Sequence, residues 1–280
     1  MSNAKAMSFK ARINKLAKSL GIRPQTVIVN FMFERFLERL SHSRYKEFFV
    51  IKGGVLVSAM VGLRARATMD IDTTVVKMKM SIPSMRKAIA EIVAVDVGDE
   101  VDFKVPTAER IRLNVDGYDG IRVKLEAAYC GLRVPFAIDV TGGDSLVPPP
   151  TGYEYKCLFT ENLVLGVRAY AIETVLAEKC ETILQRNVVG TRPRDYYDVY
   201  ILSRTQKYDP AKFKKALLAT CRRRGTEALL GKRDEILSQI RSSAIQRKYW
   251  SRYQTEFPYA KTIEFADAVT AVSILLDAVC

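Results

Sequence analysis

Residues 51–76, with the sequence IKGGVLVSAMVGLRARATMDIDTTVV, constrain the fold more than any other part of the chain. At the start of this segment, residues 48–51 form a short apolar run that is typical of a buried strand. The Gly53-Gly54 pair predicts a tight turn, and residues 55–61 begin a helix. Residues 70–77 are then expected to form a second strand. The segment therefore predicts a strand, a glycine turn and a helix that leads into another strand.

Two carboxylates, Asp70 and Asp72, open this second strand. Side chains two positions apart on a strand point to the same face, so these carboxylates lie side by side and repel each other. A divalent cation relieves the repulsion, and Mg²⁺ or Mn²⁺ accepts such oxygen ligands while keeping positions for phosphate and water. Gly53 and Gly54 supply backbone N–H groups and a helix N-terminus for a triphosphate. Such a metal can bring a hydroxyl to an α-phosphate, although each motif alone is also common as a plain turn or strand end.

The remaining chain is expected to combine helices with an extended middle region. The segment LAKSLGIRPQTV resembles the centre of a helix-turn-helix, but the apolar FMFERFLERL that follows favours packing over the reading of DNA. Cys130-Gly131 predicts a hairpin turn, and residues 148–150 predict a linker or a surface crossing. Helices are expected over residues 8–20, 25–41, 81–95, 172–187, 194–204, 210–223, 226–242 and 264–279, and extended segments over residues 101–105, 109–115, 120–129 and 133–141.

These patterns predict an α+β protein. A chain of 280 residues with 48% hydrophobic content can bury a core without disulfides or structural metals. We expect residues 1–150 to contain the N-terminal helices and an α/β core with a mixed sheet. Residues 151–280 are expected to form a mainly helical region that completes the active site.

The formal net charge of +13 is unevenly distributed along the chain. Residues 1–52 carry +8 and residues 179–261 carry +11, whereas residues 53–178 carry −3. An acidic middle between basic flanks suits a carboxylate site that recruits a metal and surfaces that attract a polyanion such as nucleotide or RNA. A solvated basic surface that only aids solubility is the alternative.

The sequence argues against several kinds of site and location. No signal-peptide pattern follows the basic N-terminus and no apolar run is long enough to span a membrane, so we expect a cytoplasmic protein. The single histidine, His42, lies in a polar segment where a solvated or capping role is expected. The five cysteines form no CxxC pair, which disfavours a zinc site and cysteine–histidine catalysis. They are Cys130, Cys157, Cys180, Cys221 and Cys280.

The motifs taken together resemble the AbiEii/AbiGii-type toxin nucleotidyltransferases, a family of the DNA polymerase β-like superfamily. The family's KGG turn, helix and R-x-[ST]-x-D-[ILV]-D pattern corresponds here to Lys52-Gly53-Gly54 and residues 66–72. Its lysine-bearing helix, later arginine and R-D-x-x-D-[LV] helix correspond to Glu178-Lys179, Arg186 and residues 194–199. The resemblance covers about residues 25–205, and the motifs are specific jointly rather than singly.

The resemblance implies a polymerase β-like fold that moves a nucleoside monophosphate from an NTP, in some members onto the 3′ end of tRNA. It also implies a bacterial toxin that a cognate antitoxin neutralises. Asp70 and Asp72 are then metal ligands, Lys179 contacts the triphosphate as a compact cation, and Asp195 or Asp198 completes the catalytic site. The same resemblance assigns nucleotide binding to Lys52, Gly53, Gly54, Arg66 and Thr68.

Asp139 is the candidate for a third metal-binding carboxylate, which this superfamily usually adds from a neighbouring strand. Its place late in the apolar strand 133–141 suits that role, but an aspartate that caps the turn at residues 141–143 is an equally good interpretation. Tyr196 and Tyr197 are expected to pack in the core rather than to stack on bases.

Other functions fit parts of the same pattern. A nucleotidyltransferase that modifies a small molecule or a protein would use the same turn and acids, although the basic flanks favour a nucleic-acid acceptor. A nucleic-acid-binding regulator with an inert catalytic fold would use residues 10–40, but both acids, the glycine turn and Lys179 are retained. The triplet at residues 222–224 is a candidate contact for an RNA backbone, and a cationic helix end explains it equally well.

Overall fold

A computed structural model describes residues 3–112, 119–160 and 162–279. The chain forms two compact units. The first unit contains Met1–Gly143 and Thr151–Ala169, and the second contains Asp144–Pro150 and Tyr170–Cys280. Residues 151–169 therefore belong to the unit that holds the sheet.

Two helices begin the first unit: α1 spans Asn3–Leu20 and α2 spans Pro24–His42. Gly21 separates them with a φ of +67°, a left-handed conformation that favours glycine. Pro24 lies in the first turn of α2, where its missing N–H would have no partner within the helix. Most side chains of α2 are buried, Phe33 completely. A helix buried in this way has no free face for the reading of DNA bases.

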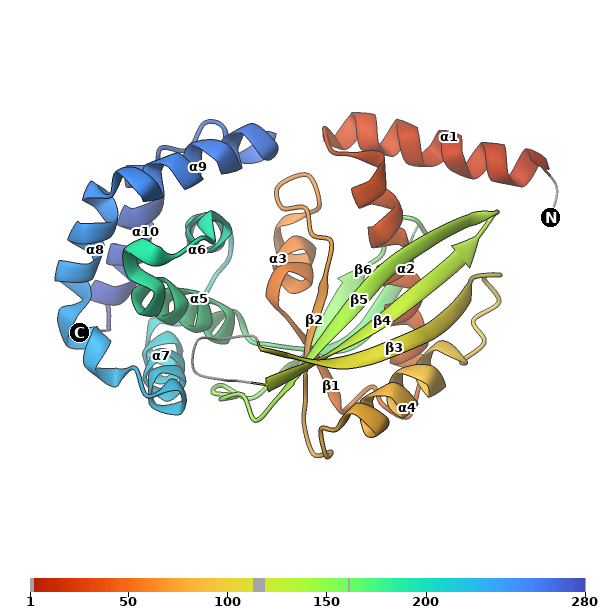
Figure 1. The fold of residues 1–280 in the computed structure, drawn as a ribbon, viewed down its shortest axis with the longest axis horizontal. Helices are drawn as coiled ribbons and strands as arrows, with labels where there is room; N and C mark the ends of the chain where they lie inside the picture. The colour runs from red at the N-terminus through yellow and green to blue at the C-terminus, as the bar shows by residue number, and fades with distance from the viewer. Residues whose placement is uncertain (1–2, 113–118, 161, 280) are drawn as a thin grey trace. The chain divides into compact units, whose positions relative to one another are not determined.

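A seven-stranded mixed sheet forms the core of the described first unit (Figure 1), with the order β3-β4-β5-β2-β1-β7-β6. β2 pairs with β5, and β1 with β7, in parallel, while the other neighbours are antiparallel. The strands are β1 (Phe49–Lys52), β2 (Ile71–Val75), β3 (Asp102–Arg112), β4 (Asp119–Tyr129), β5 (Leu132–Gly142), β6 (Thr151–Lys156) and β7 (Val164–Ala169).

The sheet confirms the predicted α+β class, and it contains two strands that the sequence analysis did not anticipate. β4 and β5 form the hairpin predicted at Cys130-Gly131, and both turn residues have positive φ. The predicted segments 101–105 and 109–115 form one strand, β3, with a register shift between Lys104 and Thr107. Residues 113–115 of that prediction lie outside the described residues. β6 and β7 are a correction, because helices were expected to follow the prolines directly.

Helices α2 and α4 pack against each other and against the sheet, which fixes the orientation of the strands. α4 spans Ile82–Val93 and begins with the predicted cap, in which the Ser81 side chain accepts from the Ser84 N–H. The rings of Phe33 on α2 and Phe136 on β5 have centroids 5.5 Å apart. Since side chains alternate along a strand, Phe136 faces these helices and Asp139 faces the opposite side of the sheet.

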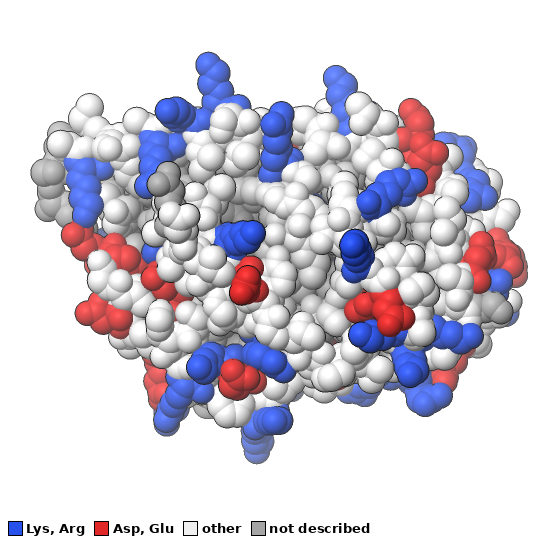
Figure 2. All heavy atoms as spheres, turned by 180° about the vertical axis from the view of Figure 1, so that it is seen from behind, with Lys and Arg blue, Asp and Glu red and all other residues white. Residues whose placement is uncertain are grey.

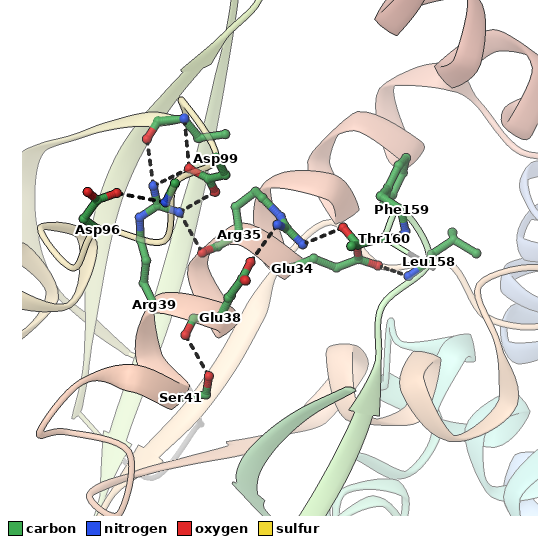
Figure 3. A network of polar contacts seen from close by, with 12 residues as sticks. Glu34, Arg35, Glu38, Arg39, Ser41, Asp96, Asp99, Leu158, Phe159 and Thr160 are labelled. Carbon is green, nitrogen blue, oxygen red and sulfur yellow. Dashed lines mark hydrogen bonds and ion pairs between the residues drawn. The ribbon is translucent and has the colours of Figure 1, made fainter. Parts of the chain in front are cut away.

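A polar network ties α2 to the loop between β6 and β7 (Figure 3). The Glu34 carboxylate accepts hydrogen bonds from the Leu158 N–H at 2.5 Å and the Phe159 N–H at 3.2 Å. Burial raises the pKa of Glu34 to about 7, although both N–H donors act in the opposite direction. One helical turn further on, Arg39 makes two bonds of 2.7 Å to the carboxylate of Asp99.

The second unit is helical in its described part after the linker at Asp144–Pro150. The Tyr170 hydroxyl donates to the Asp144 carboxylate at 2.6 Å, which ties the linker to the chain that follows. The α-helices are α5 (Ile172–Arg186), α6 (Pro193–Thr205), α7 (Pro210–Arg224), α8 (Arg233–Ser242), α9 (Ala244–Glu256) and α10 (Phe265–Asp277). Short 3₁₀ turns cover Asn187–Val189, Glu227–Lys232 and Pro258–Ala260.

Two features of this unit differ from expectation. The helix predicted over residues 226–242 is a 3₁₀ turn followed by α8, and α9 was not predicted at all. α9 is held by Trp250, whose indole N–H donates to the Ile263 carbonyl at 2.9 Å. Among the described residues, no helix is both long and apolar enough to cross a membrane.

Candidate active site

The glycine turn and the second aspartate of the DxD motif are in direct contact. Helix α3 spans Gly53–Val61 and starts immediately after β1, so Gly54 lies in its first turn. The Gly54 N–H donates to Asp72 Oδ2 at 3.2 Å. Gly53 has a φ of +59°, and a Cβ at this position would lie 2.1 Å from the same oxygen. The turn thus needs glycine, and one N–H that the sequence assigned to a triphosphate holds Asp72 in place.

The side chains of Arg66 and Thr68 lie next to the glycine turn. Both side chains are buried. The Arg66 guanidinium donates to the Ala67 carbonyl, and the Thr68 hydroxyl donates to the Asp70 carbonyl at 3.3 Å. A Cβ on Gly54 would lie 2.8 Å from Thr68 Oγ1. These contacts give both residues a role in shaping the Asp70–Asp72 segment.

Charged side chains form a row across four neighbouring strands. Lys52 lies opposite Asp72 across β1 and β2, Asp72 opposite Asp139 across β2 and β5, and Asp139 opposite Arg122 across β5 and β4. Residues directly opposite each other share a face of the sheet, and this face is the one turned away from α2. Two carboxylates at the centre of the row therefore have one cation on each side.

The Asp70 and Asp72 carboxylates suit a hard divalent ion. Asp70 is exposed and Asp72 is half-buried. Mg²⁺ is usually held by one or two carboxylates together with substrate phosphates and water. Within residues 3–112, 119–160 and 162–279, no three His, Cys, Asp or Glu side chains are grouped so that they could hold a metal ion.

The later motif residues lie together in the second unit. Lys179 on α5 is 3.0 Å from Asp195 Oδ1 and 2.7 Å from Asp198 Oδ2 on α6. All three side chains are largely inaccessible, with 12%, 8% and 0% exposure. Burial alone would raise the pKa of Asp195, but the charges of Lys179 and Arg192 outweigh it and lower that pKa. The trio is a largely buried cluster in which Lys179 lies between two carboxylates.

The arginine triplet in the last turn of α7 is not a uniform cationic surface, which corrects one interpretation of the sequence. Arg224 is largely buried and donates to the Glu181 carboxylate, with Glu178 a further 3.5 Å contact. Arg222 is exposed and lies 3.3 Å from Glu227. Arg224 is therefore part of the interior of the helical unit.

Other sequence candidates have structural positions. Tyr196 and Tyr197 are buried, as expected for packing residues. His42 ends α2 and is exposed. The described cysteines are all free thiols, and they are Cys130, Cys157, Cys180 and Cys221.

On one face of the molecule, basic side chains are mixed with acidic ones instead of forming one patch. Figure 2 shows Lys and Arg scattered among Asp and Glu on the face turned to the viewer. On α9, however, Arg247, Lys248 and Arg252 are all exposed, and among the described residues none of them forms an ion pair. The opposite side of this helix is buried through Trp250 and Tyr253. α9 therefore presents one cationic face.

The chain is similar to known proteins over most of its length. A family model described as "Nucleotidyl transferase AbiEii toxin, Type IV TA system" matches residues 35–271. Among solved structures, MenT4, a nucleotidyltransferase toxin from Mycobacterium tuberculosis H37Rv, has a TM-score of 0.58 and 14% identity, covering 96% of this chain and 98% of that one. JHP933 from Helicobacter pylori has a TM-score of 0.48 and 13% identity, covering 92% of each chain. No curated protein sequence matches the chain.

Proposed function

The chain belongs to the AbiEii family of nucleotidyltransferase toxins, and from this premise we propose that it transfers a nucleoside monophosphate from an NTP to RNA, with the 3′ end of a tRNA as the acceptor. As a member of that family it is an enzyme and the toxin of a toxin-antitoxin system. Its fold is shared with the MenT4 toxin. We further propose that it acts in the cytoplasm and is neutralised by a cognate antitoxin protein.

The contact between Asp72 and the glycine turn carries the proposal. It places the Asp72 carboxylate at the N-terminus of α3, and Asp70 lies two residues earlier, just before β2. We propose Asp70 and Asp72 as the ligands of Mg²⁺ or Mn²⁺, and Lys52, Gly53 and Gly54 as the residues nearest the NTP phosphates. Arg66 and Thr68 are proposed to serve nucleotide binding indirectly, because they shape this turn.

The proposed reaction is one displacement at phosphorus. A hydroxyl of the acceptor attacks the α-phosphate, the new P–O bond forms, the bond to the β-phosphate breaks and pyrophosphate leaves. The hydroxyl proton passes to a carboxylate or to water. A bound divalent ion supplies charge neutralisation for the phosphates and the leaving group. Asp72 on β2 and Asp70 immediately before it would hold this ion next to the phosphates.

Lys179, Asp195 and Asp198 are proposed to serve the same reaction. The family resemblance supports this role, and so does the geometry, because a lysine with 12% exposure between two carboxylates is held in one conformation. We propose that Lys179 neutralises triphosphate charge and that Asp195, at the start of α6, fixes its position. Asp198 is completely buried and lies 2.7 Å from Lys179.

The experiment is transfer to total bacterial RNA with Mg²⁺ and each labelled NTP in turn. We expect label on RNA from wild-type protein and none from the Asp70→Asn and Asp72→Asn variants, which lose a metal ligand but also lose like-charge repulsion and so keep the fold. Asp102→Asn, an exposed aspartate on β3, is the matched control and should label RNA normally. Wild-type activity in either active-site variant, or label only on protein or small molecules, would contradict the proposal.

A further inference from the structure

The ion pair between Arg122 and Asp139 is the best-defined interaction on the catalytic face of the sheet. Arg122 Nε lies 2.7 Å from Asp139 Oδ1, and Arg122 Nη2 lies 2.7 Å from Asp139 Oδ2. This two-bond geometry is the strong, directional form of the arginine–carboxylate contact. It uses both oxygens of the carboxylate that the sequence offered as a third metal ligand. Asp139 is therefore already fully engaged by a neighbouring side chain.

The accessibility of the two partners differs sharply. The Asp139 side chain is 9% exposed, whereas the Arg122 side chain is 39% exposed. A guanidinium has five N–H donors, and two are used by Asp139, so three remain on the accessible side of the pair. The carboxylate is the fixed partner, and the arginine is the one that can meet a ligand.

Arg122 also lies near the first aspartate of the DxD motif. Its hydrogen bonds with Asp139 are the main reason that the pKa of Arg122 is raised, and the nearby charge of Asp70 acts in the same direction. Asp139 is level with Asp72 on the adjacent strand. The guanidinium is thus fixed next to the two proposed metal ligands, on the side of the row opposite Lys52.

We propose that Arg122 is a further substrate-binding residue, which donates to the β- and γ-phosphates of the NTP and to the departing pyrophosphate. Asp139 is a positioning residue that acts through Arg122 and does not bind the metal. A planar guanidinium with unused donors matches phosphate oxygens in geometry and charge. The inference rests on the proposed function, because it assigns the phosphates of the same reaction to a particular side chain.

The test separates phosphate binding from metal binding. The probes are inorganic pyrophosphate with Mg²⁺, followed by calorimetry, and Mn²⁺ alone, followed by electron paramagnetic resonance. We expect Arg122→Gln and Asp139→Asn each to weaken pyrophosphate binding by about tenfold or more, and the double variant to be no weaker than either single one. The Mn²⁺ affinity of Asp139→Asn should stay within about twofold of wild type, whereas Asp72→Asn should lose it.

Two further variants complete the experiment. Arg133→Gln removes a charge from the same β4–β5 hairpin, where Arg133 pairs with Glu126 at 3.3 Å, and it should leave pyrophosphate binding unchanged. Arg122→Lys keeps the charge without the planar fork, and we expect partial recovery relative to Arg122→Gln. If Arg122→Gln does not fold, Arg122→Lys takes its place in the binding measurements.

Three outcomes would overturn the inference: a tenfold loss of Mn²⁺ affinity in Asp139→Asn, pyrophosphate binding by Arg122→Gln and Arg122→Lys at the wild-type level, or additive effects of the two substitutions. Absence of nucleotide transfer by the wild-type protein would instead contradict the proposed function, so the two failures are distinguishable.

Discussion

Gly53 is the single residue at which the active site tolerates least change. Its φ of +59° is left-handed, and a side chain there would meet the carboxylate of Asp72 at 2.1 Å. We predict that Gly53→Ala lowers the free energy of unfolding by at least about 1–2 kcal/mol from the backbone conformation alone. Displacement of Asp72 should also abolish Mn²⁺ binding. Denaturant unfolding and Mn²⁺ titration measure the two effects separately.

Gly62 provides the matched control, at the other end of the same helix. Its φ is +87°, yet no atom lies within 4 Å of the position that a Cβ would occupy. Gly62→Ala should therefore show the conformational cost without the loss of metal affinity. Equal loss of Mn²⁺ binding in both variants would mean that backbone strain, and not the contact with Asp72, explains the effect.

At the scale of single residues, the sequence was informative where neighbours in the chain decide the geometry. The common face of Asp70 and Asp72 stays a prediction, because β2 begins at Ile71 and Asp70 lies before it. The Gly53-Gly54 turn between β1 and α3 could be predicted. The Arg122–Asp139 pair could not, because it depends on the register between β4 and β5 and the two residues are remote in the chain. Because Arg122 alternates with the apolar residues Ile121 and Val123, the sequence indicated only that its side chain points away from the core. Arg224 was misread for the same reason, since its partner Glu181 lies on another helix.

Among the elements, the loop between β6 and β7 depends on one carboxylate from α2. Glu34 accepts both loop N–H groups, and burial raises its pKa to about 7 from an ordinary value of 4.5. The folded chain thus keeps a proton on Glu34 at pH values where the unfolded chain has released it. Raising the pH from 4.5 to 7 therefore favours unfolding, by about 3 kcal/mol for a shift of this size.

We predict that Glu34→Gln removes this part of the pH dependence. The difference in unfolding free energy between wild type and variant should change steadily between pH 4.5 and 7 in favour of the variant, and should be constant above pH 7. Arg12 and Arg35 lower the pKa of Glu34, so replacing either with glutamine should extend the decline to higher pH. Parallel stability curves for wild type and Glu34→Gln between pH 4.5 and 7 would contradict the prediction.

Element prediction succeeded for segments with strong periodicity or caps. Ser81 before an amphipathic run predicted the start of α4, and the glycine turn predicted the start of α3. β6 and β7 were missed because β7 pairs with β1, more than a hundred residues earlier, and only that pairing makes the segment part of a sheet. α9 was missed because its exposed face is densely charged and only a few buried positions, Trp250 among them, mark its inner side.

At the scale of the whole molecule, the net charge determines how strongly a polyanion is attracted. Lys and Arg side chains outside ion pairs determine where on the surface it binds. If α9 contacts the RNA acceptor, binding should weaken with salt by a slope of about 0.7–0.9 per neutralised phosphate. We predict that replacing Arg247, Lys248 and Arg252 with glutamine lowers the magnitude of that slope. The decrease should be about 0.7–0.9 for each of the three residues that contacts a phosphate. The Michaelis constant for NTP should stay unchanged.

A second variant with the same net charge tests whether position matters. Lys5, Lys124 and Arg133 are each paired with a glutamate, at 2.5, 2.9 and 3.3 Å. Their joint replacement by glutamine removes the same three charges, but each was already neutralised locally. We expect this variant to keep the wild-type salt slope. Identical slopes for both triple variants would show that RNA responds to overall charge and not to α9.

The row of charges across β1, β2, β5 and β4 is completed only late in the synthesis of the chain. A ribosome translating this chain makes Lys52 and Asp72 first, and Arg122 and Asp139 emerge only after α4 and β3. The row exists only when β5 has paired with β2. A nascent chain, or a product terminated before β5, therefore carries the DxD motif without its assembled surroundings. Such fragments should be harmless to the cell that makes them.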